Sequence, residues 1–165
     1  MKEENQDRIN RILHHKKFLE YVSKNEKAEK ERIFCKHGIE HFLDVARIAY
    51  IKALEQQLPL KKDVIYGTAL LHDIGKHRQY EEKIPHELAS AELAHQILLE
   101  CGYEEEECNL MEEAIKSHRT KPSLQSHELE RILYEADKQS RLCYFCKAQS
   151  GCNWSDEKKN LFIKY

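Results

Sequence analysis

Glycine and proline are scarce in this sequence, with five glycines and three prolines among 165 residues. Long stretches are instead rich in glutamate, lysine, leucine and alanine. A chain with so few helix-breaking residues is expected to be all-α. At this length we expect a single domain over residues 1–165 that buries about two-thirds of the surface its unfolded form exposes.

Long apolar runs and an excess of basic charge are also missing. No apolar run is long enough to cross a membrane, and the N-terminal residues are polar, so we expect neither a membrane span nor a signal peptide. The net charge is −2, which does not indicate a sequence-wide basic surface for nucleic acid. We therefore expect a cytoplasmic protein whose six cysteines are core thiols or metal ligands rather than disulfides.

Apolar residues that recur at three- and four-residue intervals predict a series of helices. The expected helical segments are 5–23, 39–58, 62–75, 85–102, the stretch from 104 to 118, and a last helix from about 126 through 137. Residues 77–85 (HRQYEEKIP) are expected to form a charged loop.

The segment 70–78, LLHDIGKHR, carries the first sign of chemistry. It ends an apolar helical run in the adjacent pair His72 and Asp73, followed by Gly75 and Lys76. An imidazole nitrogen and a carboxylate oxygen at one helix end can bind the same metal ion. The pair alone is weak evidence, because His-Asp occurs by chance in many proteins.

Two polar residues lie where an amphipathic helix should be apolar. His118 lies seven residues after Met111, and Asp137 lies four residues after Leu133, so both side chains are expected to face inward. A buried unpaired carboxylate costs several kcal/mol unless a cation or several donors satisfy it. Taken singly, a hydrogen-bonded core histidine and a salt-bridged or capping aspartate remain open readings.

His118 and Asp137 belong to a larger set of polar residues, which is distributed over five predicted helices. Each member lies at or near a helix end or on the inner face of a helix, which is how helical bundles build metal sites. The set is His41, His72, Asp73, His86, His118 and Asp137.

The order H…HD…H…H…D, with HDIGK at its centre, resembles the HD superfamily of metal-dependent phosphohydrolases. The local contexts HFLDVARIA, HELASAELAHQIL, AIKSHR and ILYEADK are similar as well. The resemblance covers about residues 37–141 and implies an HD-domain helical bundle. Residues 142–165 would then form a short Cys-containing tail that packs on this core.

The resemblance also implies the roles of the six residues. The mononuclear core of the family corresponds to His41, His72, Asp73 and Asp137. The further pair, His86 and His118, matches members that hold two metals bridged by the aspartate of the HD pair.

Within the superfamily the ligand pattern is most similar to that of the bacterial symmetrical diadenosine tetraphosphate hydrolases, whose site resembles a di-iron centre. Those enzymes continue after the fourth histidine with a Thr-Thr-Gly-like stretch, whereas residues 119–122 here are RTKP. This departure weakens the case for a dinucleotide substrate, but it does not alter the six expected metal ligands. The GYP motif of cyclic-di-GMP phosphodiesterases is absent, which argues against that activity.

We therefore expect a metal-dependent phosphohydrolase that acts on a nucleotide or another phosphoester through metal-activated water. Phosphomonoesterase, phosphodiesterase and nucleotide pyrophosphohydrolase activities remain open. Imidazole and carboxylate ligands suit iron, manganese or zinc better than magnesium. The resemblance to a di-iron site implies two divalent or trivalent metal ions, iron first, with manganese or zinc as alternatives. The expected partner is a small phosphorylated substrate. We expect neither membrane binding nor specific nucleic-acid binding, and the sequence leaves open whether the chain forms a homodimer.

Catalytic and substrate-binding roles are assigned to residues near these ligands. Asp73 and Lys76 are the expected catalytic residues. Cations that can neutralise the phosphoryl oxygens are Lys76, Arg78, Arg119 and Lys121.

The C-terminal segment contains a C-x2-C-x5-C pattern formed by Cys143, Cys146 and Cys152. Spacing suggests Cys35 as a fourth ligand, because it lies six residues before His41 just as Cys143 lies six after Asp137. If those two ligands meet on antiparallel helices, both cysteines are displaced by about 9 Å in the same direction.

Three states of these cysteines stay open: a structural zinc site, an iron–sulfur cluster and free thiols. The alternative to an enzyme is a catalytically weak metal- or nucleotide-binding module, or a redox-sensing module, that uses the cysteine cluster. Cys101 and Cys108 have no such neighbours in the sequence and are expected at ordinary apolar positions.

Overall fold

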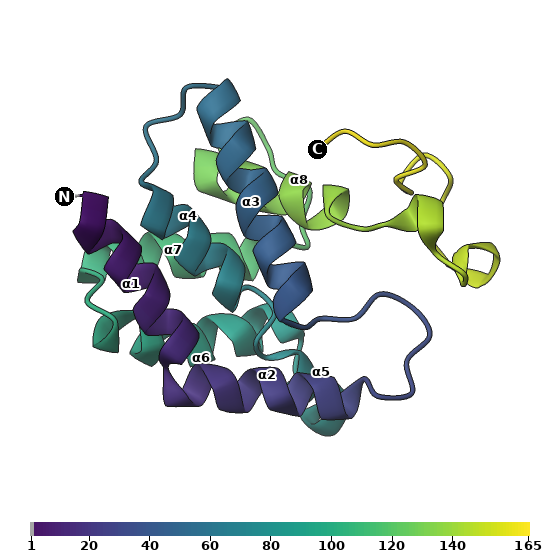
Figure 1. Ribbon diagram of the computed structural model, residues 1–165, viewed down its shortest axis with the longest axis horizontal. Helices are drawn as coiled ribbons and strands as arrows, with labels where there is room; N and C mark the ends of the chain where they lie inside the picture. Colours follow the sequence, from purple (N-terminus) through teal and green to yellow (C-terminus); the bar gives the residue numbers. More distant parts are fainter. Residues whose placement is uncertain (1) are drawn as a thin grey trace.

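The structure is a computed structural model that describes the backbone of residues 2–165 and the side chains from residue 7 onward (Figure 1). Those residues contain helices and no strand, so the prediction of an all-α protein is confirmed. The elements are α1 (Lys2–His14), α2 (Lys16–Ala28), α3 (Ile39–Glu55), α4 (Lys62–Leu71), α5 (Lys76–Glu82), α6 (His86–Glu100), α7 (Glu105–Ser117), α8 (Glu128–Gln139) and the 3-10 turns η1 (Cys143–Phe145) and η2 (Gln149–Gly151).

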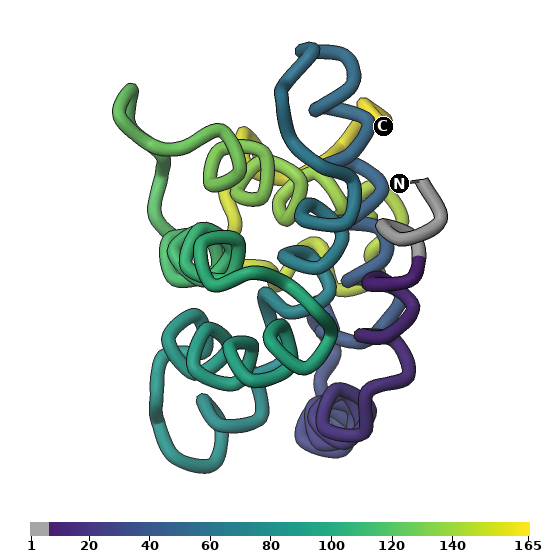
Figure 2. Tube along the Cα trace, turned by 90° about the vertical axis from the view of Figure 1, so that its left-hand side faces the viewer, coloured from purple at the N-terminus to yellow at the C-terminus, as the bar shows by residue number. Residues whose placement is uncertain are grey.

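The short helix α4 lies at the centre of the bundle. It is apolar along most of its length and contacts α1, α3, α6, α7 and α8. Figure 2 shows α6 and α7 on one side of the molecule and α1 and α2 on the other. Because α4 is covered on so many sides, the residues that follow it are carried into the interior.

Gly75 allows the turn after α4 to approach the start of α6. A Cβ atom at this position would lie 2.5 Å from the Ser90 backbone nitrogen and 2.7 Å from the Ala89 carbonyl carbon. The Gly75 backbone N–H also donates to Ser90 Oγ at 2.9 Å. The close contact holds the turn that contains His72 and Asp73 against the helix that begins with His86.

Three expectations about helix boundaries differ from the structure. The helix expected over residues 62–75 ends at Leu71, and residues 72–75 form turns. The pattern over residues 5–23 divides into α1 and α2 at His15, whose Nδ1 accepts from the Lys17 backbone N–H at 3.2 Å and caps the second helix. The expectation of a loop over residues 77–85 is wrong in its first part, because α5 lies there. A polar contact holds the N-terminal turn of α5, because Asn25 Oδ1 accepts from the His77 backbone N–H at 2.8 Å. A helix fixed in this way needs no stripe of apolar residues, so the sequence pattern does not predict it.

The segment after α8 extends away from the bundle beside the loop that joins α2 to α3 (Figure 1). Arg141 connects the two by donating to the Lys36 carbonyl oxygen at 2.9 Å. Asn160 Nδ2 donates to the carbonyl oxygens of Lys138 and Arg141 at 2.6 and 2.9 Å. Among residues 2–165, no helix has the length and apolar character that a membrane span requires.

Candidate metal centre

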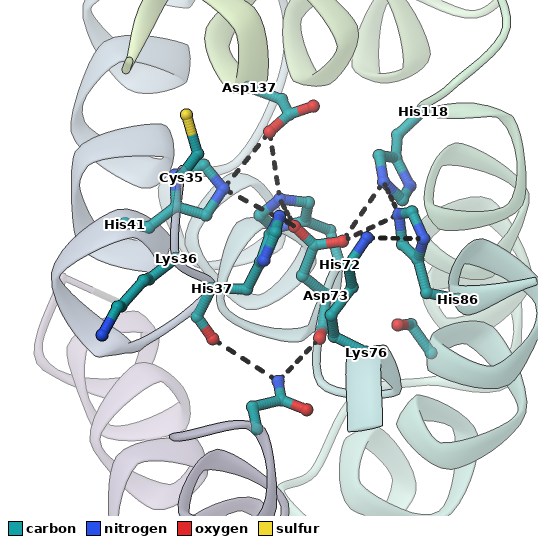
Figure 3. Close-up of polar contacts among 12 residues, drawn as sticks. Cys35, Lys36, His37, His41, His72, Asp73, Lys76, His86, His118 and Asp137 are labelled. Carbon is teal, nitrogen blue, oxygen red and sulfur yellow. Dashed lines mark hydrogen bonds and ion pairs between the residues drawn. The ribbon is translucent and has the colours of Figure 1, made fainter. Parts of the chain in front are cut away.

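The structure brings together all six side chains that the sequence predicts as metal ligands (Figure 3). One lies in the first turn of α3, two at the C-terminal end of α4, one at the start of α6, one at the C-terminal end of α7 and one near the end of α8. In that order they are His41, His72 with Asp73, His86, His118 and Asp137.

The six residues form two groups that share Asp73. In each group the ligand atoms all lie within 4.8 Å of one another. The first group is His41, His72, Asp73 and Asp137, and the second is Asp73, His86 and His118.

The two carboxylate oxygens of Asp73 face different groups. Oδ2 lies 3.1 Å from His72 Nε2 and 3.6 Å from His41 Nε2. Oδ1 lies 3.2 Å from His86 Nε2 and 3.4 Å from His118 Nε2. Asp73 therefore presents one carboxylate oxygen to each group of ligand atoms.

Asp137 completes the first group from the opposite side. Its Oδ1 lies 3.2 Å from His41 Nε2 and 3.5 Å from His72 Nε2. Burial alone would raise the pKa of Asp137 and of Asp73, but the surrounding histidines hold both pKa values well below the usual range. Both carboxylates therefore stay ionised, as metal ligands must.

Backbone carbonyls fix the orientation of two of the histidines. His72 Nδ1 donates to the Ala69 carbonyl oxygen and His118 Nδ1 to the Ile115 carbonyl oxygen, both at 2.6 Å. Because a carbonyl oxygen only accepts, Nδ1 carries the proton and Nε2 can present its lone pair to a cation.

The other two histidines are oriented by side chains. His41 Nδ1 lies 3.2 Å from Ser140 Oγ, and His86 Nδ1 lies within hydrogen-bond distance of Gln79 Oε1 and of Lys76 Nζ. His86 Nε2 and His118 Nε2 then face each other at 3.3 Å. The two nitrogens are close enough to bind the same cation.

Buried polar atoms that lack a hydrogen-bond partner also indicate that a cation belongs at this centre. His41 Nε2, His72 Nε2 and Asp73 Oδ1 are buried and lack a hydrogen-bond partner. Burial opposes protonation of His72, yet Asp73 and Asp137 raise its pKa to about 10. The two carboxylates thus make the surroundings of His72 favourable for a cation. The residues present fit a metal centre.

A cavity of about 620 Å³ opens over the centre. The acidic side chains that line it are Asp73, which belongs to both ligand groups, and Asp137, which belongs to the first. The cavity is otherwise rich in cations and contains aromatic rings, so it attracts an anion. The cations are Arg32, Lys76, Arg119, Lys138, Arg141 and Lys158, and the rings are Phe34, Tyr80 and Trp154.

The structure brings only two of the four predicted substrate cations to this cavity. Lys76 is buried, which lowers its pKa, and its Nζ lies 3.2 Å from His86 Nδ1. Arg119 lies at the rim with more than half of its side chain exposed. Arg78 instead pairs with two glutamates, and Lys121 lines a separate surface hollow.

Sequence reasoning missed a buried pair beside the first group, formed by His37 and Glu29. His37 Nε2 lies 3.9 Å from Asp73 Oδ2, and His37 Nδ1 donates to Glu29 Oε1 at 2.5 Å. Burial lowers the pKa of His37 to about 4, while the contacts with His37 and Tyr80 lower the pKa of Glu29 to about 2 against its burial. The signal in the sequence was a histidine four residues before His41.

Lys138 was also missed, although it belongs to the ADK segment. Its Nζ lies 3.2 Å from Asp137 Oδ2 and donates to the His118 carbonyl oxygen at 2.8 Å. Burial lowers its pKa. Lys138 thus places a cation beside the first group, as Lys76 does beside the second.

Comparison with known proteins agrees with this geometry. The family described as "HD domain" matches residues 38–142. This chain belongs to the HD domain family. HD domains bind divalent metals, and membership supports a metal-dependent phosphohydrolase in general, without specifying the compound that is hydrolysed.

Two similar proteins extend the comparison. An uncharacterized protein from Clostridium beijerinckii is 48% identical over 159 residues, which cover 96% of this HD domain protein and 99% of that one. The crystal structure of a predicted HD superfamily hydrolase from an uncultured Thermotogales bacterium matches with a TM-score of 0.61 at 24% identity. That match covers 85% of this chain and 79% of the other, and it concerns the fold.

Proposed function

We propose that this HD domain is a phosphohydrolase that uses two metal ions and acts on a nucleotide or another phosphoester. The observation that carries the proposal is the position of Asp73 between two groups of ligand atoms, with one carboxylate oxygen toward each. Two ions held by one bridging carboxylate are a common arrangement for displacement at phosphorus.

The ligand set determines which metals fit. Four imidazoles and two carboxylates suit iron, manganese or zinc, and the resemblance of the ligand order to a di-iron site puts iron first. Such ions, when bound, lower the pKa of a water molecule and polarise a phosphoryl oxygen. In this proposal His41, His72 and Asp137 hold one ion, His86 and His118 hold the other, and Asp73 contacts both.

Two lysines, of which Lys76 is buried and Lys138 half-buried, provide the electrostatic part of catalysis. Lys76 lies beside the second group and Lys138 beside the first, so their ammonium groups flank the position of a phosphoryl group. Their charges oppose the negative charge on the phosphoryl oxygens and remain fixed as the transition state develops. Arg119 at the rim adds a third cation on the approach to the site.

Aromatic rings on the cavity wall favour a nucleotide over a simple phosphate ester. Phe34 and Trp154 line the cavity together with the cations. The Arg32 guanidinium carbon lies 6.0 Å from the Phe34 ring centre, and Lys158 Nζ lies 4.7 Å from the Trp154 ring centre. Rings beside cations can stack on a base while the phosphates are neutralised.

The test is a hydrolysis assay with protein purified without oxygen and loaded with ferrous iron or manganese. The substrates are nucleoside mono-, di- and triphosphates, dinucleoside polyphosphates and p-nitrophenyl phosphate. Dinucleoside polyphosphates are included because the ligand order resembles that of the symmetrical diadenosine tetraphosphate hydrolases. We expect metal-dependent release of phosphate or nucleoside monophosphate from at least one nucleotide.

Asp73→Asn should lose both metal and activity, because an amide cannot give an anionic oxygen to each group. His95→Ala is the matched control, since His95 lies on α6 outside both groups and should keep metal and activity. Full metal content and activity in Asp73→Asn would refute the assignment.

A second candidate is a module that binds metal and senses redox state with negligible turnover. It is favoured by Cys35 and Cys152, which line the cavity over the metal centre. Protein that holds two metals but hydrolyses nothing in the substrate panel would favour this candidate over the enzyme.

A further inference from the structure

A second cavity, of about 690 Å³, lies beside the first. Four of the six cysteines line it, one from the loop between α2 and α3 and three from the segment after α8. They are Cys35, Cys143, Cys146 and Cys152. All four are free thiols, and Cys143 is buried while the other three are half-buried.

Two tight turns present the three C-terminal thiols. In η1 the Cys146 backbone N–H donates to the Cys143 carbonyl oxygen at 3.1 Å. In η2 the Cys152 backbone N–H donates to the Gln149 carbonyl oxygen at 3.2 Å. Gln149 Nε2 also donates to the Cys143 carbonyl oxygen at 2.6 Å, which connects the two turns.

The segment that carries these thiols has little apolar core of its own. Leu142, Phe145, Phe162 and Ile163 are 59%, 83%, 82% and 75% exposed. A segment of this size that buries so few apolar side chains gains little stability from the hydrophobic effect and needs a cross-link to hold one shape. A metal centre that joins it to the loop at Cys35 would be such a cross-link.

We propose that Cys35, Cys143, Cys146 and Cys152 bind an iron–sulfur cluster. The separation of the thiols argues against a single zinc ion. Tetrahedral zinc with bonds of about 2.3 Å requires sulfur atoms roughly 3.8 Å apart. The four thiols form no group of ligand atoms within 4.8 Å of one another in the part of the chain that the structure describes. A cluster spaces its ligands more widely, because its thiolates bind different iron atoms.

The surroundings of the thiols also suit a cluster. Arg141 lines the same cavity as the four cysteines and is held there by its hydrogen bond to the Lys36 carbonyl oxygen at 2.9 Å. Arg141 is thus a cation placed to offset the negative charge of thiolates bound to iron. The Arg32 side chain donates to the Cys35 carbonyl oxygen at 2.8 Å and holds the loop in place.

The cysteine cavity shares a wall with the cavity over the metal centre. Phe34, Cys35, Arg141, Cys152 and Trp154 line both. Figure 3 shows the Cys35 sulfur on the same side of the centre as His41 and Asp137. A cluster would therefore fix a wall of the substrate cavity. This consequence, unlike the cluster itself, rests on the proposed function, and it predicts that loss of the cluster raises KM more than it lowers kcat.

The test measures acid-labile sulfide, iron and zinc in full-length protein purified without oxygen and reconstituted with ferrous iron and sulfide. We expect about four sulfides per chain for a four-iron cluster, with a visible charge-transfer band. Cys146→Ser and Cys152→Ser should each contain less than half of the acid-labile sulfide of the wild type. Both side chains are half-buried, so these variants are expected to fold, which circular dichroism verifies.

Two sets of controls separate the cluster from the HD centre. Cys101→Ala and Cys108→Ala change buried cysteines outside the cavity and should keep the sulfide. His86→Ala alters the HD centre and should also keep it, because iron held by imidazole and carboxylate carries no sulfide. Failure of the proposed hydrolase therefore leaves the sulfide measurement intact.

Two results would overturn the inference. The first is one zinc ion per chain that is lost in Cys146→Ser and Cys152→Ser, with no sulfide in the wild type. The second is a wild-type protein in which neither sulfide nor metal content depends on these cysteines.

Discussion

One ion of the proposed pair should be removable while the other stays. His86 and His118 belong to the second group only, and His41, His72 and Asp137 to the first only. His86→Ala therefore leaves the first group with all of its ligand atoms. We expect the variant to bind one metal ion per chain where the wild type binds two.

The effect on stability follows from mass action. An ion that binds only the folded state stabilises it by about 2.7 kcal/mol at a free concentration of 100 Kd. For a chain of 165 residues, 1 kcal/mol shifts Tm by about 2–4 °C. Each ion should then raise Tm by about 5–11 °C, and two ions by about twice that. His86→Ala should halve the difference in Tm between the metal-loaded and the metal-free protein.

The measurement uses protein stripped with a chelator and titrated with manganese, which thiolates bind poorly, so that the cysteines do not contribute. Elemental analysis counts the ions, and calorimetric scans give Tm with and without metal. His95→Ala on the same helix should behave like the wild type. Two ions bound to His86→Ala, or none, would refute the division into two groups around Asp73.

Three further changes test other parts of the structure. Lys76→Met should lower kcat/KM at least about 100-fold through lost charge stabilisation while metal content stays constant; an unchanged rate would exclude the lysine from catalysis. Ion pairing with Arg8 lowers the pKa of Glu107 to about 2 although burial opposes it, so its contribution is present above pH 4.5 and lost as the pH falls toward 2. Glu107→Gln should therefore cost about 1–3 kcal/mol at pH 7 in urea unfolding, and the gap from the wild type should close on acidification. Gly75→Ala should destabilise the fold and weaken metal binding, because its Cβ would meet the Ser90 backbone nitrogen at 2.5 Å; a Tm equal to that of the wild type would contradict this.

The periodicity of the sequence predicts helices well where the helix is amphipathic or apolar. The helices that contain His41, His86 and Asp137 follow the expected apolar spacing. Periodicity fails for α5, whose turn is fixed by Asn25 across the bundle rather than by an apolar face. A contact between residues 52 positions apart leaves no local pattern to read. The same limit applies to His15, because a capping role depends on a side-chain contact rather than on apolar spacing.

Part of the candidate metal centre was predictable from local pattern, because two of its six residues occupy positions that an amphipathic helix reserves for apolar residues. The full set is predicted only from the resemblance to the HD superfamily. His118 and Asp137 are visible as exceptions to a pattern, whereas Lys138 and Arg141 follow no pattern that marks them as part of a cavity. Arg78 is an example of a residue that the sequence wrongly placed at the substrate. It lies two residues after Lys76, but helix α5 directs it to the outer face, where it pairs with Glu82. The order of the candidate ligands can thus be read from the sequence, while the residues that line the cavity depend on how the helices pack together. For this reason the sequence predicts the class of reaction further than it predicts the substrate.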